Sequence, residues 1–148
     1  MSEQATEPCA NLELVRSIYA DWERGDFSSV GWAHPEIEFV FNGGPDPVNP
    51  TGLAGMVERF RDFLSAWEAY HIGADEYREL DSERVLVLTR SRARGKMSGL
   101  ELGQLGGTGA NVFHIRDGKV IRLVLDWDRA HALAELWREG YQGWARGA

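Results

Sequence analysis

The sequence contains little that could form a disulfide, attract a polyanion or cross a membrane. Cys9 is its single cysteine, so no disulfide can form within the chain, and a lone thiol is typical of a reducing cytoplasm. The net charge of −7 disfavours nucleic acid and anionic membrane surfaces, because both require a basic face on the protein. No apolar run reaches the ~18 residues of a membrane span. The composition predicts a cytoplasmic protein with no nucleic-acid or membrane partner.

The residue patterns of common metal and cofactor sites are also missing. The histidines His34, His71, His114 and His131 have no spacing typical of metal ligands, and no GxSxG nucleophile motif is present. Gly103–Gly109 resembles a phosphate-binding loop, but it leads into a strand instead of opening a helix. We interpret the Gly-rich stretch 95–109 as a Gly-interrupted strand or the approach to one. We therefore expect no metal and no cofactor.

The length of 148 residues is typical of one domain with a substantial core. The polar residues 1–10 are expected to form a loose leader, followed by a single domain over 11–139. Residues 140–148 form a tail whose Tyr141 and Trp144 favour docking over free exposure.

Hydrophobic periodicity predicts helices over 11–24, 27–32, 51–69 and 129–139, and strands over 36–42, 72–80 and 84–93. In the first helix Asn11 is a suitable N-cap and Gly25 a suitable end. The apolar stripe of the third consists of Val57, Phe60, Leu64 and Trp67, with Met56 and Phe63 beside it. The last helix follows Asp128 as N-cap, with Ala130, Leu133, Leu136 and Trp137 expected to face inward.

Residues 111–128 are predicted to form a β-hairpin around which the rest of the chain is arranged. A two-residue turn pairs Arg116 with Lys119, whereas a bulged turn pairs Ile115 with Lys119. The bulged register gives the cleaner apolar face, so we prefer it. It places Asn111, as the single amide, on a face with Phe113, Ile115, Ile121, Leu123, Leu125 and Trp127, and it places His114, Arg122 and Asp126 on the opposite face.

This element order predicts an α+β fold in which helices cover one face of a curved, mostly antiparallel sheet. The sheet and the helices over 11–24 and 51–69 then enclose a cone-shaped cavity. Arg90, Arg92 and Arg94 alternate along a strand, where a solvated face is the simpler interpretation and an anion-binding row the alternative.

Several segments resemble the SnoaL-like proteins, which include polyketide cyclases, within the nuclear transport factor 2-like superfamily. They are Arg24-Gly-Asp26, His34-Pro-Glu-Ile-Glu-Phe-Val-Phe41, Gly44-Pro-Asp-Pro47, Phe113-His-Ile-Arg-Asp-Gly-Lys-Val120 and Asp128-Arg-Ala-His-Ala-Leu133. The resemblance covers roughly residues 11–138 and implies a cone-shaped, cystatin-like roll. These are scaffold motifs, and the chemistry of the superfamily varies widely.

The resemblance also implies candidate chemistry. SnoaL-type polyketide cyclases rely on an Asp and a His, which correspond in residue type to Asp126 or Asp128 with His114. Limonene epoxide hydrolase uses an Asp–Arg–Asp set, which Arg90 or Arg92 with Asp126 matches only in part. The catalytic groups of ketosteroid isomerase, an Asp base with Tyr and protonated Asp donors in an apolar cavity, are not matched. Their positions fall on Ile18, next to Tyr19, and near Val40 and Asn111.

We therefore expect a protein that binds a small, largely apolar, cyclic or polyketide- or terpenoid-like molecule. The catalytic candidates are Asn111, Asp126 and His114, and the expected ligand-binding residues are Tyr19, Trp22, Phe39, Phe113, Leu125 and Trp127. A cofactor-independent isomerase, cyclase, hydrolase or dehydratase is one hypothesis, and a non-catalytic ligand-binding or dimerisation module is the other. Apolar side chains on the outer sheet face, such as Val112, Val120 and Val124, predict a homodimer.

Overall fold

The computed structural model describes residues 2–42, 51–65, 67–95 and 107–138. Its elements, in chain order, are α1 (Ser2–Glu23), β1 (Ala33–Asn42), α2 (Leu53–Ser65), β2 (Trp67–Glu79), β3 (Arg84–Gly95), β4 (Thr108–Arg116), β5 (Lys119–Asp126) and α3 (Arg129–Arg138). The Gly-rich stretch predicted over 95–109 and the tail over 140–148 lie largely or wholly outside the described residues.

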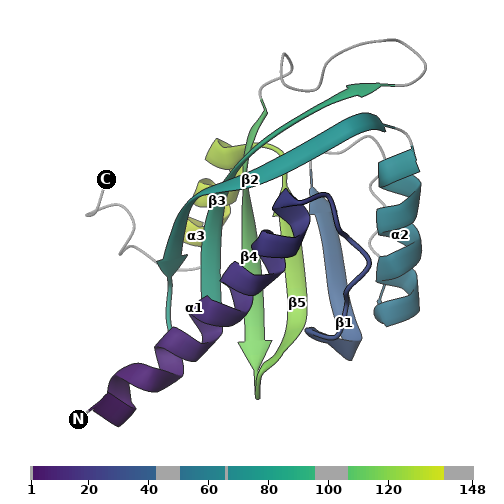
Figure 1. Ribbon diagram of the computed structural model, residues 1–148. Helices are drawn as coiled ribbons and strands as arrows, with labels where there is room; N and C mark the ends of the chain where they lie inside the picture. The colour runs from purple at the N-terminus through teal and green to yellow at the C-terminus, as the bar shows by residue number, and fades with distance from the viewer. Residues whose placement is uncertain (1, 43–50, 66, 96–106, 139–148) are drawn as a thin grey trace.

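The strands form one curved sheet in the order β1-β5-β4-β3-β2. The pairing of β1 with β5 is parallel and the other pairings are antiparallel. The sheet is therefore mostly antiparallel, as predicted. Figure 1 shows α1 lying across one face of the sheet, α2 beside β1, and α3 behind the sheet. The prediction that helices cover one face only is therefore wrong for α3. No described helix is long and apolar enough to cross a membrane.

The helix α1 begins earlier than its sequence pattern predicted. It runs from Ser2, so residues 2–10, which we expected to form a loose leader, continue the helix in front of Asn11. It ends as predicted at Gly25, whose positive φ of 82° suits a residue without a Cβ. The short helix expected over 27–32 is absent, because Asp26 instead accepts hydrogen bonds from the backbone N–H and hydroxyl of Ser28 in a turn.

The helix α2 is shorter than predicted and turned about its axis. It ends at Ser65, and from Trp67 onward the chain pairs with β3 as the long edge strand β2. Met56 and Phe63 are its buried apolar residues, whereas Val57, Phe60 and Leu64 are only partly buried. The ladder with β3 supplies hydrogen-bond partners on one side of this segment, an alternative to continuing the helix.

The central hairpin has the turn that we rejected and the faces that we predicted. Arg116 pairs with Lys119, and Asp117 and Gly118 both have positive φ, as in a type I′ turn. A bulge after Val120 then shifts the register by one residue, so that Phe113 pairs with Leu123. Val120 takes the buried place expected for Ile121, and the apolar face with Asn111 is preserved.

The convex face of the sheet is covered by α3. Asp128 caps this helix as predicted, because its Oδ1 accepts hydrogen bonds from the backbone N–H groups of Ala130 and His131. Ala132 and Leu136 are buried in a second cluster with Leu80, Leu86, Ala110 and Val112, against which Val124 and Leu133 also pack. The other residues expected to face inward do not, since Ala130 is exposed and Trp137 retains 49% of its surface.

Candidate functional site

A cavity lies on the concave face, between the sheet, the end of α1 and α2. We call it the aromatic cavity, and it is lined by Trp22, Phe27, Phe41, Phe60, Phe63, Tyr70, Ile72, Thr89, Ser91, Gly107, Thr108, Gly109, Asn111, Leu125, Asp126 and Trp127. Its free volume is about 40 Å³. A single water needs about 10–15 Å³ and ligand pockets typically offer about 300–1,000 Å³. In this state the cavity has room for water but not for a molecule with several rings.

Five of the residues predicted for the site line this cavity. Trp22 comes from α1, Leu125 and Asp126 come from β5, Trp127 follows β5, and Asn111 comes from β4. The parallel pairing of Phe41 with Leu125 places the ends of β1 and β5 side by side, and the rings of Phe41 and Trp127 lie 5.9 Å apart. The structure thus brings residues from distant segments to one end of the sheet.

The other predicted aromatic residues form the packing layer behind the cavity. Tyr19, Phe39 and Phe113 have no exposed surface and do not line it. Phe113 lies 6.4 Å from the ring of Trp22, and Phe39 stacks on Phe60 at 5.5 Å. Their place in this structure is therefore behind the lining residues, which they hold in position, and their contact with a ligand stays a prediction.

The predicted lone amide of the concave face has a partner in α1. Asn111 Nδ2 donates a hydrogen bond to the hydroxyl oxygen of Tyr19, and both residues are buried. Burial raises the pKa of Tyr19 well above its usual value, against a smaller lowering by this hydrogen bond. Tyr19 is consequently a neutral phenol, and Asn111 joins it to the cavity surface.

The sheet side of the aromatic cavity carries further neutral polar groups. Thr89 and Ser91 follow Val85 and Val87 on the concave face of β3, so apolar side chains give way to hydroxyls toward this end of the strand. Ser91 lies opposite Ile72 on β2, and its backbone N–H donates to the carbonyl of Gly107 at 2.7 Å. Burial raises the pKa of Tyr70, while a hydrogen bond with Ser91 opposes that rise.

Gly109 permits the close contact of strands that shapes this polar wall. A Cβ added at Gly109 would lie 2.4 Å from the backbone oxygen of Asp126 and 3.2 Å from Thr89 Oγ1. Carbon and oxygen atoms do not approach to 2.4 Å without a bond, so any larger residue here must push β4 and β5 apart.

The carboxylate of Asp126 is engaged on the convex side, by α3. Its Oδ2 lies 2.6 Å from Nδ1 of His131, and its Oδ1 accepts a hydrogen bond of 2.9 Å from the backbone N–H of Asp128. The side chain of Asp126 is 2% exposed and that of His131 is 45% exposed. The pKa of His131 is raised, first by its hydrogen bond with Asp126 and next by the negative charge of that group. The sequence paired Asp126 with His114, and the structure pairs it with His131.

His114 lies on the convex face, as its register predicted. With Arg122, Asp126 and Glu135 it lines a second depression of about 70 Å³ under α3. Arg122 reaches Glu38 on β1, with 3.5 Å between Nε and Oε1. The three catalytic candidates thus occupy two faces of the sheet: Asn111 is on the concave face, His114 is on the convex face, and Asp126 contributes to the lining on both.

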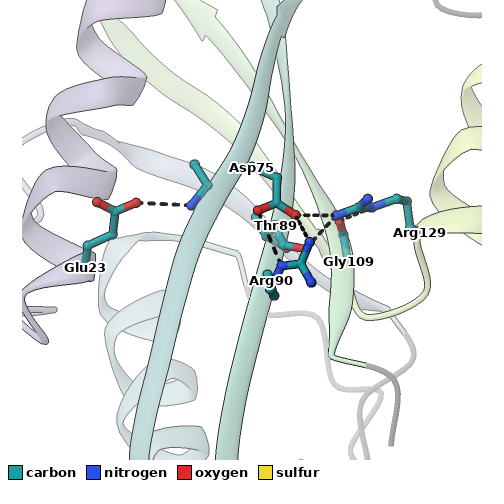
Figure 2. A network of polar contacts seen from close by, with 7 residues as sticks. Glu23, Asp75, Thr89, Arg90, Gly109 and Arg129 are labelled. Atoms are coloured by element: carbon teal, nitrogen blue, oxygen red, sulfur yellow. Dashed lines mark hydrogen bonds and ion pairs between the residues drawn. The ribbon is translucent and has the colours of Figure 1, made fainter. Parts of the chain in front are cut away.

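Figure 2 shows a set of polar contacts that involves α1, the strands β2, β3 and β4, and Arg129 at the start of α3. Arg129 donates from its guanidinium to the backbone oxygens of Thr89 at 2.8 Å and Gly109 at 3.2 Å. Asp75 on β2 lies 3.4 Å from Arg129 and 3.1 Å from Arg90. The first of the three alternating arginines is therefore ion-paired, Arg92 is exposed, and the side chain of Arg94 lies outside the described part. Glu23 at the end of α1 accepts from the N–H of Ala74 at 3.1 Å.

Sequence reasoning missed most of the aromatic residues that line the cavity and, on the polar wall, both hydroxyl residues of β3. Phe41, Phe60 and Phe63 belonged to predicted buried faces, so their periodicity could have indicated the cavity. Tyr70 was missed because it lay just beyond the predicted helix over 51–69. Thr89 and Ser91 were detectable as the change from valine to hydroxyl residues along one strand face. Among the described residues, no group of three or more His, Cys, Asp or Glu is arranged to hold a metal ion.

Several solved structures share this fold. The chain is 22% identical to TerC, co-crystallised with polyporic acid, over 87% of this chain and 98% of that one, with a TM-score of 0.66. It is 18% identical to an NTF2-like protein of unknown function from Burkholderia pseudomallei, over 84% and 95% of the two chains, with a TM-score of 0.68. It is 14% identical to a putative SnoaL-like polyketide cyclase from Jannaschia sp. CCS1, over 85% and 90%, with a TM-score of 0.66.

These identities are low, so the three structures establish the fold alone. A search among proteins with curated descriptions found no match. The sequence itself matches the profile of the SnoaL-like domain over residues 15–123, which includes α1 from Val15, both edge strands of the sheet and the central hairpin as far as Leu123. The chain therefore belongs to the SnoaL-like domain family.

Proposed function

We propose that the protein binds a small, largely apolar ring molecule in the aromatic cavity. The observation that carries this proposal is the meeting of an aromatic wall, with Trp22, Phe60 and Trp127, and a polar wall on the sheet. Aromatic side chains supply most of the contact area in such sites, and a few polar groups set the orientation. The polyporic acid in the TerC crystals supports a ligand of this kind for the fold.

Binding of a ring compound requires the cavity to widen from its free volume of about 40 Å³. Phe60 and Trp127 are only partly buried, and they lie at the edge of the core cluster. Rotation of these two side chains would enlarge the space, and Phe60 would then give up its stack on Phe39. We expect association to be limited by this opening step, and hence slower than a simple encounter.

Catalysis by the same cavity is the second candidate, favoured by the position of Asn111. A cofactor-independent isomerase, cyclase, hydrolase or dehydratase needs a donor for a developing oxyanion, and an amide on the cavity surface has the right chemistry. A general base is also needed, and Asp126 with His114 is the candidate pair. Because the Asp126 carboxylate already binds His131 and Asp128, ligand binding without catalysis is the better supported function.

A homodimer and a cytoplasmic location complete the proposal. The valines on which the dimer prediction rested do not form an open surface, since Val112 and Val124 pack under α3 and Val120 is buried on the concave side. The half-exposed Trp137 on α3 is the remaining support for self-association. The single cysteine supports a reducing compartment.

The proposal is tested by titrating the protein with steroids, terpenoids, aromatic polyketides and polyporic acid. A ligand in the aromatic cavity should quench tryptophan emission and raise the melting temperature. Trp127→Phe should lose much of the quenching, and Trp137→Phe, which changes a tryptophan remote from the cavity, should retain it. A panel that produces neither quenching nor stabilisation in the wild-type protein would refute the proposed function.

A further inference from the structure

The polar wall of the aromatic cavity is built from neutral groups. Thr89 and Ser91 present hydroxyls, Tyr70 a phenol and Asn111 an amide. Each of these groups can both donate and accept a hydrogen bond. Such a wall can satisfy a ligand carbonyl or hydroxyl in either role, but it provides no charge to balance an ionised ligand.

Asp126 is the one acidic residue of the described lining, which holds no Lys, Arg or His. Its two oxygens already have partners, because Oδ2 meets His131 Nδ1 at 2.6 Å and Oδ1 meets the N–H of Asp128 at 2.9 Å. A ligand carboxylate entering the cavity therefore finds no cationic side chain in the described lining, and a ligand ammonium finds no free carboxylate, because that of Asp126 is held on the convex side. Either ion would be unpaired in an apolar site, where charges are poorly solvated.

We propose that the aromatic cavity selects neutral ring compounds bearing a carbonyl or hydroxyl group over the carboxylate or amine of the same ring, an inference that rests on the ligand-binding function proposed above. The aromatic wall contacts the ring, and the polar wall forms hydrogen bonds with the neutral oxygen. The selection lies in the polar wall, since all three ligand types offer the same ring to Trp22, Phe60 and Trp127.

The test uses matched triplets at neutral pH: the carboxamide, the carboxylate and the aminomethyl derivative of benzene, of naphthalene and of biphenyl. Affinities are measured by tryptophan quenching and by calorimetry. On the scaffold that fits, the carboxamide should bind about tenfold or more tightly than either ion, because transfer of an unpaired charge into the cavity is the larger cost. A carboxylate or amine that binds as tightly as the carboxamide would overturn the inference and leave the proposed function standing.

A charge placed in the polar wall provides an independent measurement. Ser91 is partly buried at the end of β3, so the long side chain of Ser91→Lys can bring an ammonium to the cavity. In this variant the carboxylate should gain affinity relative to the carboxamide, by about tenfold or more. The matched control is Ser17→Lys on the exposed surface of α1, which adds the same charge away from the cavity and should keep the wild-type order.

The possible results separate the two proposals. Selective binding of the carboxamide, reversed by Ser91→Lys and not by Ser17→Lys, supports both. An unchanged order in a folded Ser91→Lys variant contradicts the role of the polar wall. If no member of any triplet binds the wild-type protein, and the wider ligand panel also fails, then the ligand-binding function itself is refuted.

Discussion

The amide nitrogen of Asn111 on β4 donates a hydrogen bond to the hydroxyl of Tyr19 on α1, although 92 positions separate the two residues in the chain. Both are buried, but only Asn111 reaches the aromatic cavity. The pair therefore connects the packing of α1 on the sheet to the one side-chain amide in the described lining of the cavity. Stability and ligand orientation are consequently expected to depend on the same side chain.

Replacement of Asn111 by leucine should destabilise the protein. Asn111→Leu leaves the hydroxyl of Tyr19 buried without its partner, at a cost of about 1–3 kcal/mol in the free energy of unfolding. Tyr19→Phe should cost less, because Asn111 can reach water in the cavity. Denaturant unfolding of both single variants and the double variant measures the coupling. A stable Asn111→Leu protein that loses turnover about a hundredfold would instead assign the amide to an oxyanion.

Addition of a single methyl group at Gly109 should disturb the cavity. Gly109→Ala places a carbon 2.4 Å from the backbone oxygen of Asp126, so the strands must separate. Overpacking of this kind costs about 1–3 kcal/mol, which thermal and urea unfolding will detect. Gly31→Ala is the matched control, since a Cβ there meets nothing within 4 Å. Equal stability of the two variants would contradict the close contact at Gly109.

The central hairpin shows which parts of a fold a sequence pattern determines. Alternation of apolar residues predicted that Asn111, Phe113 and Leu125 share one face, and the structure places them so. The turn was predicted wrongly, because Asp117-Gly118 fits a type I′ turn equally well and a bulge beyond it can correct the faces. Burial thus determined the faces, while the register close to the turn depended on a local choice that periodicity does not detect.

The placement of α3 and the content of the cavity were harder to predict. An apolar stripe shows that one face of a helix is buried, but it does not show which face of the sheet the helix covers. The pairing of Asp126 with His131 follows from that placement, and so the sequence pointed to His114 instead. Tyr70 and Ser91 meet in the cavity only because β2 begins at Trp67, where we had predicted the end of a helix.

The contact between His131 and Asp126 should make the stability contributed by α3 depend on pH. The pKa of folded His131 is raised above its ordinary value of 6.5 by the hydrogen bond and charge of Asp126, and Glu135 and Asp128 act in the same direction. A raised folded-state pKa means that the contribution is complete below the unfolded pKa and disappears as the pH rises through the folded value. The stability difference between wild type and His131→Gln should therefore be larger at about pH 5.5 than at about pH 8.5.

Urea unfolding at the two pH values checks this expectation. Asp126→Asn removes the charge that raises the pKa of His131. In the Asp126→Asn background, the effect of His131→Gln on the free energy of unfolding should therefore differ little between the two pH values. A difference between wild type and His131→Gln that is the same at both values would show that the contact does not respond to protonation.

The proposed homodimer should involve the outer side of α3. Trp137 keeps 49% of its surface exposed there, and large exposed aromatic side chains are common at interfaces. Light scattering at micromolar concentration should give the mass of a dimer, and Trp137→Glu should shift it toward the monomer. A wild-type monomer under these conditions would exclude the dimer.

Arg129 should control the shape of the aromatic cavity although it does not line it. Its guanidinium supplies hydrogen bonds to the carbonyl oxygens of Thr89 and Gly109, and both of these residues do line the cavity. Its side chain is 28% exposed, so these bonds are partly shielded from water and their loss is only partly replaced by solvent. Arg129→Met should lower the free energy of unfolding by about 1–3 kcal/mol and should increase amide hydrogen exchange in β4 near Gly109.

A matched comparison separates this role from a general effect of lost charge. Arg138→Met removes an arginine from the other end of α3, where its side chain is 62% exposed and pairs with Glu135, so it should change stability little. Arg129→Lys retains the charge but offers no planar fork to the two carbonyls, and it should give an intermediate result. Because Thr89 belongs to the polar wall, Arg129→Met should also reduce ligand affinity, whereas Arg138→Met should not. If the two methionine variants have the same exchange rates in β4 and the same affinity, then Arg129 does not position the cavity rim.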